Sequence, residues 1–379
     1  MIDQDSTQLD LIHEPFTPMA LGGSHYLVAL QNRKGELEAL RRAPPETWTR
    51  FTPLLHVVGP KRRDVPFLAS TVSEWLKKIA SAVGEHPIYI DLMRLRPDHP
   101  VSSAGRNVPV LEHIYRAARK RGLKFVPVVW AGHSDAAHVQ TVSRSVETDG
   151  RGVAIRYAIR TLVLPPRQTL DKYLEDILAR LGVSVTQADL VFDLDYLDED
   201  ADVDVISLAE DLRSAISIGQ WRNISLLGTS MPSMLGRIKE GSLGMIPRQE
   251  WEIWAALGGR VARLITFGDY AVQHSRPPHE DGGPGMRANI RYTTERATLI
   301  ARGRGSLLLE GKEQYRDLCQ DLLNHSLFNG REYSWGDALI TDCAQGLQAP
   351  GSQNMWRGVG TSHHIQFVTD QLRERRRGD

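Results

Sequence analysis

The chain has 379 residues, and its 46 Lys and Arg balance its 46 Asp and Glu, so the formal net charge is zero. Hydrophobic residues make up 41% and charged residues 24%, which is ordinary for a globular protein and excludes a mainly disordered chain, a collagen and a membrane bundle. A zero net charge generates no overall field toward nucleic acid or anionic lipid, so only local basic patches remain to be considered.

Neither a membrane span nor an export signal is evident. No stretch approaches the roughly 18 to 20 apolar residues that cross a bilayer, and the acidic N-terminus lacks the apolar core of a signal peptide. Cys319 and Cys343 have no CxxC spacing, which argues against a disulfide framework or a structural zinc site. We therefore expect a cytoplasmic protein that binds no membrane.

Eight short apolar runs rich in β-branched residues follow one another along the chain. They predict eight strands, at residues 26–30, 52–58, 87–91, 124–130, 152–159, 188–193, 223–228 and 263–268. The runs are nearly continuous rather than alternating, which indicates strands that are covered on both faces. Amphipathic or polar stretches between them predict helices, at residues 73–80, 110–120, 133–148, 170–181, 207–216 and 250–257.

Eight strand–helix units in series are the count of a (β/α)8 barrel of the TIM type, which we expect over residues 25–287 after an N-terminal tail of residues 1–24. The alternative is an open doubly wound sheet, which usually holds fewer strands and often has a Gly-rich phosphate loop. Neither GxGxxG nor GxxxxGK followed by Ser or Thr occurs in the chain. The closed barrel is therefore the favoured fold.

The pattern changes after the eighth run, beyond a loop rich in Pro and Gly at residues 274–287. Two strands and two helices are predicted in this part, at residues 290–294, 297–301, 314–328 and 365–375. We expect an α+β extension over residues 288–379 that packs on the barrel and closes over its mouth, because fewer than 100 residues with many loops make only a modest core of their own.

Four carboxylates stand at or just after predicted strand ends, where the chemistry of such barrels lies: Asp91, Asp193, Asp195 and Asp269. Clustered carboxylates bind Mg²⁺ or Mn²⁺ through oxygen, or share protons as acid and base. We take Asp91, Asp193 and Asp269 as the candidate metal ligands. The alternative is structural, because Asp at a strand end commonly bonds the turn backbone or pairs with a nearby Arg.

Four further residues suit phosphate binding or proton transfer. After the first strand, Lys34 would hold a phosphate or carboxylate and Glu36 would orient it or act as a base, unless Glu36 only complements a helix dipole. Arg302 on a Gly-rich turn suits bidentate phosphate recognition, with a solvated surface turn as the alternative. His364, in a His-His pair, is a candidate for acid–base work, with packing as the alternative.

Aromatic residues beside charges complete the set. Tyr270 follows the eighth strand, and Trp356 precedes Arg357, as in a stacking platform, although such residues also anchor loops to a barrel. The candidate catalytic residues are Glu36, Asp269 and His364, and the candidate ligand-binding residues are Lys34, Asp91, Tyr270, Arg302, Trp356 and Arg357.

Short segments along nearly the whole chain, from about residue 25 to 372, share an order and spacing with a known family. They include Tyr26-Leu-Val-Ala-Leu30, Lys34-Gly-Glu36, Gly268-Asp-Tyr270, Tyr292-Thr293, Arg302-Gly303, Ser334-Trp-Gly-Asp337, Trp356-Arg357 and His363-His-Ile365. In these the chain resembles the beta family proteins, bacterial and prophage proteins named after the beta protein of a satellite phage. It departs from them at residues 294–297, where an aromatic is typical, and at Ser362, where Asn is common, and either change would alter a site there.

The resemblance implies an association with mobile elements and, through it, antiphage defence, with the product of an adjacent defence or toxin gene as partner. It adds weight to Lys34, Glu36, Asp269, Arg302 and His364 without assigning them an activity. We expect a protein that binds a phosphorylated ligand, nucleic acid or a partner protein at the barrel mouth. The alternatives are a metal-dependent hydrolase of the phosphodiesterase or nuclease kind, which uses the rim carboxylates, and an interaction scaffold without activity.

Overall fold

A computed structural model describes residues 24–59, 67–95, 100–103, 106–132, 136–159, 164, 168–276 and 286–378. The expected N-terminal tail, apart from Ser24, lies outside the described residues, and so does most of the expected Pro- and Gly-rich loop at residues 274–287. None of the described helices is both long enough and apolar enough to cross a membrane.

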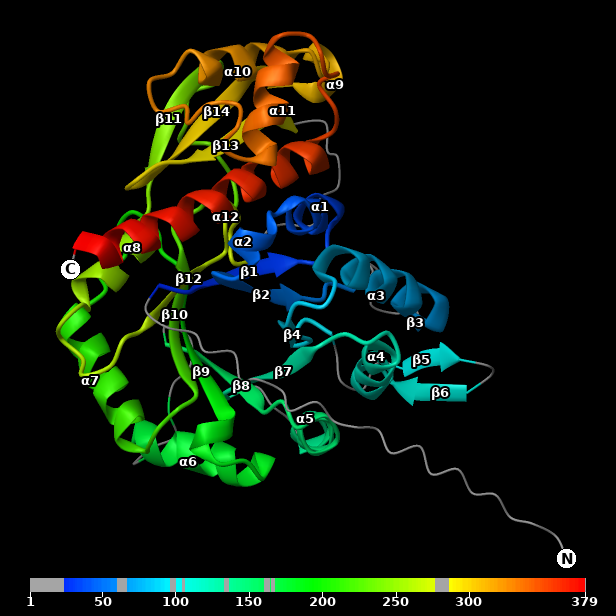
Figure 1. Cartoon of the computed structure of the whole chain (residues 1–379), viewed down its shortest axis with the longest axis vertical. Helices are drawn as coiled ribbons and strands as arrows, with labels where there is room; N and C mark the ends of the chain where they lie inside the picture. The colour runs from blue at the N-terminus through cyan, green and yellow to red at the C-terminus, as the bar shows by residue number, and fades with distance from the viewer. Residues whose placement is uncertain are drawn as a thin grey trace, which may run out of the picture.

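Eight parallel strands form a closed barrel in the order β1-β12-β10-β9-β8-β7-β4-β2 (Figure 1). These strands are β1 (Tyr26–Gln31), β2 (Phe51–His56), β4 (Ile88–Asp91), β7 (Phe125–Trp130), β8 (Val153–Ala158), β9 (Ala188–Tyr196), β10 (Asn223–Thr229) and β12 (Thr266–Asp269). Tyr26 is in register with Phe51 of β2 on one side and with Phe267 of β12 on the other, so the first and last strands are paired. The predicted (β/α)8 barrel is confirmed, and the open-sheet alternative is wrong.

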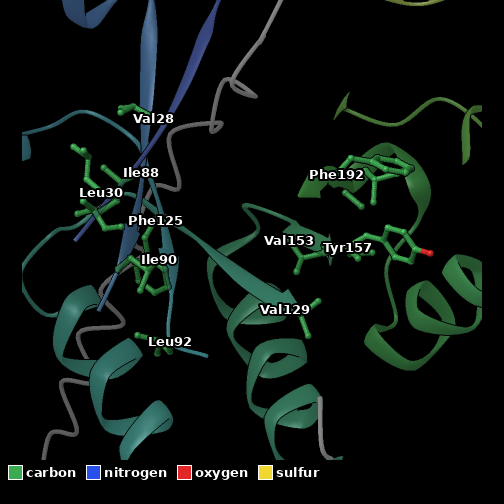
Figure 2. Packing of buried hydrophobic residues seen from close by; sticks show 14 of the residues in the cluster. Val28, Leu30, Ile88, Ile90, Leu92, Phe125, Val129, Val153, Tyr157 and Phe192 are labelled. Carbon is green, nitrogen blue, oxygen red and sulfur yellow. The ribbon is translucent and has the colours of Figure 1, made fainter. Parts of the chain in front are cut away.

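Side chains alternate between the two faces of the barrel wall. Leu27 and Ala29 of β1 pack inside the barrel, in a cluster to which β2, β4, β7, β8, β9 and β10 also contribute. Val28 and Leu30 point outward and join the larger cluster beneath the helices, part of which Figure 2 shows. Because both faces of each strand are buried, the strands read as continuous apolar runs in the sequence.

Helices cover the outside of the barrel. They are α1 (Lys34–Arg42), α2 (Pro45–Trp48), α3 (Ala69–Val83), α4 (Val110–Arg119), α5 (Ala136–Asp149), α6 (Leu170–Leu181), α7 (Val205–Ser217) and α8 (Gln249–Ala256), with a short 3-10 turn η1 (Val185–Gln187). All six helices expected in this part of the chain are present, the polar one as α5. A small sheet of β3 (Phe67–Leu68), β5 (Pro100–Ser103) and β6 (Arg106–Pro109) was not expected.

A second sheet stands beside the barrel, in the order β11-β14-β13. It consists of β11 (Ser242–Pro247), β13 (Arg287–Thr293) and β14 (Ala297–Ser306), and it is followed by α9 (Leu307–Glu310), α10 (Gln314–Leu323), α11 (Trp335–Ala344) and α12 (Gln353–Gly378). The sequence did not predict β11, which lies between β10 and α8 and is antiparallel to β14. The extension sheet therefore includes a strand from the part of the chain that forms the barrel.

The long helix α12 lies between the barrel and this second sheet (Figure 1). It crosses α1 at Gly35 and Gly358, where main-chain atoms meet: a Cβ on Gly35 would lie 2.0 Å from the carbonyl oxygen of Asn354, and one on Gly358 would lie 2.6 Å from the carbonyl oxygen of Gly35. Next to the last barrel strand, Arg291 of β13 donates to the carbonyl of Val272, which follows β12. These contacts hold the extension against the β1 and β12 side of the barrel.

The substitution Gly35→Ala should destabilise the protein, because the added methyl group meets main-chain atoms that cannot move aside alone. Overpacking of this kind costs about 1–3 kcal/mol, which urea unfolding would measure. Gly236→Ala is the matched control, since a Cβ there has no described atom within 4 Å, and it should change the free energy of unfolding by less than about 0.5 kcal/mol. Equal midpoints for the two variants would contradict the close helix crossing.

Candidate functional site

A buried group of charged side chains lies inside the barrel at the carboxyl ends of the strands. It contains Arg156 of β8, Asp91 of β4, Asp193 of β9 and His56 of β2, with Tyr270 just after β12, and each is at most 3% exposed. Each strand residue is two positions beyond an inward apolar side chain, as Asp91 follows Tyr89 and Asp193 follows Val191. We call this group the Arg156 network.

The guanidinium of Arg156 joins the two carboxylates. It donates from Nη1 to Asp91 Oδ2 at 2.6 Å and from Nη2 to Asp193 Oδ2 at 2.6 Å. The Tyr270 hydroxyl donates to the same Asp193 oxygen at 2.9 Å. The Trp130 indole Nε1 donates to Asp91 Oδ2 at 2.8 Å, and its ring lies 4.2 Å from the Arg156 guanidinium carbon. Paired and hydrogen-bonded in this way, the charges tolerate burial.

The protonation states follow from these contacts. Burial alone would raise the pKa of Asp91, but His56 and Arg156 outweigh it and hold that pKa well below its usual range. Burial and the neighbouring Arg156 lower the pKa of His56 to about 4, so this imidazole is neutral at pH 7 although its Nδ1 lies 3.1 Å from Asp91 Oδ2. One guanidinium with two carboxylates leaves the floor of the mouth with a formal charge of −1.

The rim above this floor carries the opposite charge. Arg94, which follows β4, is exposed and donates to the carbonyl oxygen of Ser275, in the segment after β12. Arg276 is also exposed and pairs with Asp195 at 2.7 Å. Removal of water by surrounding atoms lowers the pKa of Arg94, and Arg156 and Arg276 are near enough to act on it as well. The rim and the floor therefore face each other with opposite charge.

A second ion pair inside the barrel lies at the other end of the strands. Asp189 of β9 accepts from Arg222 Nε at 2.8 Å and from the Tyr89 hydroxyl at 2.9 Å. It lies four residues before Asp193 on the same strand, near the amino end. In barrels of this type that end supports stability and the carboxyl end carries chemistry, so we take only the Arg156 network as the candidate site.

Two of the predicted catalytic residues do meet, but outside the barrel wall. His364 Nε2 lies 2.9 Å from Asp269 Oδ2, while its Nδ1 lies 2.7 Å from Thr293 Oγ1. Tyr26 also donates to Asp269. Asp269 points outward from the barrel wall, as Phe267 does two residues before it, and it is buried between β1, β12 and α12. Both ring nitrogens of His364 are thus occupied in joining α12 to the barrel.

The predicted metal site is not formed. Asp91 and Asp193 face inward and share Arg156, whereas Asp269 faces outward and contacts His364 and Tyr26. Within the part of the chain that the structure describes, no group of three His, Cys, Asp or Glu side chains is arranged to hold a metal ion. The proposal that Asp91, Asp193 and Asp269 are ligands of one ion is therefore wrong.

The remaining predicted residues do not join the Arg156 network. Lys34 is exposed on α1, and Glu36 is buried, where desolvation raises its pKa and Arg357 and Arg33 oppose that rise. Arg302 donates to the carbonyls of Leu235 and Ile238 and so holds the segment that leads into β11. The predicted role of Arg302 in phosphate binding is corrected accordingly.

Trp356 is likewise not a stacking platform. Its side chain is 2% exposed and stacks on Tyr315 with the ring centroids 5.0 Å apart, in the core of the extension. Arg357 lies close enough to Glu36 to influence its pKa, at the crossing of α1 and α12. Of the nine residues predicted to bind or react, the structure brings together three separate pairs: Asp91 with Tyr270, Asp269 with His364, and Glu36 with Arg357.

His56, Trp130 and Arg156 are central members of the network that the candidate list omitted. A signal for them exists in the sequence, since His56, Trp130 and Arg156 each end or nearly end a predicted strand. It was insufficient because both faces of these strands are covered, and the sequence then does not show which alternate residues point into the barrel.

These features define a closed (β/α)8 barrel with a charged network at the carboxyl ends of its strands and an extension built on a separate three-stranded sheet. The family model described as Beta protein matches residues 26–370, so the chain belongs to the Beta protein family. A comparison with curated proteins gave no match.

Solved structures of similar arrangement have low sequence identity. The carboxyl transferase domain of Rhizobium etli pyruvate carboxylase, solved with pyruvate and biocytin, is 10% identical with a TM-score of 0.35, and the match covers 66% of this chain and 40% of that one. A putative lyase/mutase from Burkholderia cenocepacia is 12% identical with a TM-score of 0.34, over 67% of this chain and 78% of that one. The strand pairing, and not these similarities, establishes the barrel.

A buried carboxyl group close to Asp269 should make stability depend on pH. It belongs to Glu250 of α8 and accepts from the Ser230 hydroxyl at 2.6 Å. Burial raises its pKa from 4.5 to about 7, with Arg248 opposing and Asp269 adding to the rise. Because the folded state prefers the protonated form, ionisation costs stability as the pH rises from the pKa of the unfolded chain through that of the folded protein.

The variant Glu250→Gln removes this ionisation. Its free energy of unfolding relative to wild type should become more favourable by about 2.5 kcal/mol between pH 5 and pH 8, measured by urea unfolding at both values. Glu252→Gln is the control, because Glu252 lies on the same helix but its side chain is 51% exposed. If the Glu250 and Glu252 variants showed the same pH dependence, the buried acid would not have the role assigned to it.

Proposed function

We propose that the protein binds a small phosphorylated ligand that carries hydroxyl groups, such as a sugar phosphate, at the carboxyl-terminal mouth of the barrel. In the cell this binding would serve antiphage defence or a mobile element, together with the product of an adjacent gene, as the resemblance to the beta family proteins implies. The observation that carries the proposal is the position of Arg94 over the Arg156 network.

Arg94 is a cation that has no carboxylate partner among the described residues. Its recorded hydrogen bond goes to the Ser275 carbonyl, and no carboxylate among the described residues lies within ion-pair distance of it. Because a carbonyl does not neutralise a guanidinium, the rim retains a positive charge that suits a phosphoryl group. Ser275 belongs to the segment after the eighth strand, and in barrels of this type the loops after the seventh and eighth strands frequently bind phosphate.

The floor of the mouth suits the other end of such a ligand. Asp91 and Asp193 are acceptors, and Gln31, which is in register with His56, has a buried Oε1 without a described hydrogen-bond partner. A buried acceptor without a partner costs free energy that a donor would recover. Hydroxyl groups supply such donors and add no positive charge, so a phosphorylated polyol matches both the floor and the rim.

Ribose 5-phosphate, ribose and inorganic phosphate are the probes that test this proposal by calorimetric titration. Ribose 5-phosphate should bind more tightly than either fragment, because only it contacts rim and floor. Arg94→Gln should weaken its binding about 10- to 100-fold, as expected for a hydrogen bond to a charged group. Arg331→Gln, at an exposed arginine that pairs with Asp342, should leave binding unchanged.

Equal affinity of the two variants, or no binding of any probe by the wild type at 10 mM, would contradict the proposal. In cells, Arg94→Gln should also abolish any protection against phage that the gene confers together with its neighbours. A second candidate function, hydrolysis, is favoured by the neutral His56 beside Asp91, since such a histidine can accept a proton. Release of phosphate from ribose 5-phosphate in the same titrations, lost in His56→Gln, would identify it.

A further inference from the structure

Five arginines gather where α7, the segment between α8 and β12, and the C-terminal end of α12 meet. They are Arg213, Arg260, Arg263, Arg375 and Arg376, and we call them the arginine patch. Arg213 Nη2 donates to the carbonyl of Arg260 at 3.0 Å, and Arg375 Nη2 donates to the carbonyl of Ala255 at 3.5 Å, so three separate parts of the chain are in contact here. Figure 1 shows the C-terminal end of α12 beside α8.

Each arginine of the patch is held by a neutral acceptor. Arg260 donates to the carbonyl of Ala256 at 2.9 Å, Arg263 to that of Arg222 at 3.2 Å, and Arg376 to the hydroxyl of Ser24 at 3.2 Å. Among the residues that the structure describes, none of the five has an ion pair with a carboxylate. Their positive charges are therefore fixed in place without being neutralised.

Several exposed arginines elsewhere on the protein are paired with carboxylates instead. Arg42 pairs with Glu38 at 2.9 Å, Arg304 with Asp317 at 2.9 Å and Arg331 with Asp342 at 3.1 Å. Because the net charge of the whole chain is zero, the unpaired arginines concentrate positive charge on one part of the surface. The patch lies at the amino ends of β1 and β12, since Ser24 precedes β1 and Arg263 precedes β12, and it is therefore at the opposite end of the barrel from the mouth.

The spread of the patch over three elements requires a ligand with several separated negative charges. Guanidinium groups match phosphate oxygens with two parallel hydrogen bonds. Trp254 lies beside the patch, and the guanidinium carbon of Arg375 lies 5.2 Å from its ring centroid, so that an arginine covers a face on which an unpaired base would otherwise stack. A membrane-binding surface would add a row of apolar side chains, whereas Leu264 is the exposed large apolar side chain described within the segment between α8 and β12.

We propose that the arginine patch binds the phosphate backbone of duplex nucleic acid without reading its sequence. The backbone repeats negative charges along a rigid surface, and the fixed guanidinium groups from three elements contact several of them at once. This binding is independent of the ligand proposed for the barrel mouth, because the two surfaces lie at opposite ends of the strands.

The test uses the full chain and a fluorescent 20-base-pair DNA duplex, with anisotropy measured between 25 and 150 mM salt. The triple variant R260Q/R375Q/R376Q should bind at least about tenfold more weakly at 50 mM salt, and the slope of log K against log salt should flatten by about 3, one unit for each lost contact. The control R42Q/R304Q/R331Q changes the net charge by the same amount at arginines paired with carboxylates, and it should bind within twofold of wild type.

The proposal would be overturned by no binding of the wild type at 50 mM salt, by equal weakening in the patch and control variants, or by binding to phosphatidylserine vesicles without binding to the duplex. Preference for a single strand of the same sequence would also reject the duplex assignment. Melting temperatures establish that each variant is folded, and R213Q/R376Q, with an expected slope change of about 2, replaces the triple variant if the latter unfolds.

Discussion

The burial of Arg156 inside a ring of strands is the constraint on which the rest of the barrel mouth depends. Moving a guanidinium out of water costs several kcal/mol, about as much as a well-placed pair of carboxylates recovers. Asp91 and Asp193 supply that pair from β4 and β9, and His56 and Tyr270 fill the remaining space from β2 and the segment after β12. Only a closed ring brings these strands around one point, so ring closure and the charge network require each other.

A different principle joins the extension to the barrel. At the crossing of α1 and α12, Gly35 and Gly358 let two backbones touch, and beside it the outward cluster of Tyr26, Asp269 and His364 provides polar contacts. The chemistry-bearing residues of the sequence are thus divided between an inward network with a charged rim and an outward cluster that holds α12. The same residue types form the proposed recognition site on one face of the wall and attach the extension on the other.

The sequence was sufficient to predict the barrel, because its strands are apolar on both faces and most of its helices are amphipathic. It was insufficient for β11, a six-residue strand that contains Gly244 and Pro247, and for the first half of α12, since the last helix was predicted to begin only at residue 365. The site was only half predicted for a related reason. Asp193 and Asp269 both lie at the ends of apolar strands. Asp193 faces inward like Val191, two residues before it, whereas Asp269 faces outward like Phe267. Because both faces of such a strand are buried, the sequence does not show which alternate residues face inward.

The most direct test of this account is the free energy of unfolding of two variants, measured by urea denaturation. Arg156→Met leaves two buried carboxylates without their partner and should cost about 3–5 kcal/mol. The triple variant R156M/D91N/D193N removes all three charges and should recover more than half of that loss. A single variant that costs less than about 1 kcal/mol, or a triple variant no more stable than the single one, would contradict the claim that a balanced, buried charge network organises the barrel mouth.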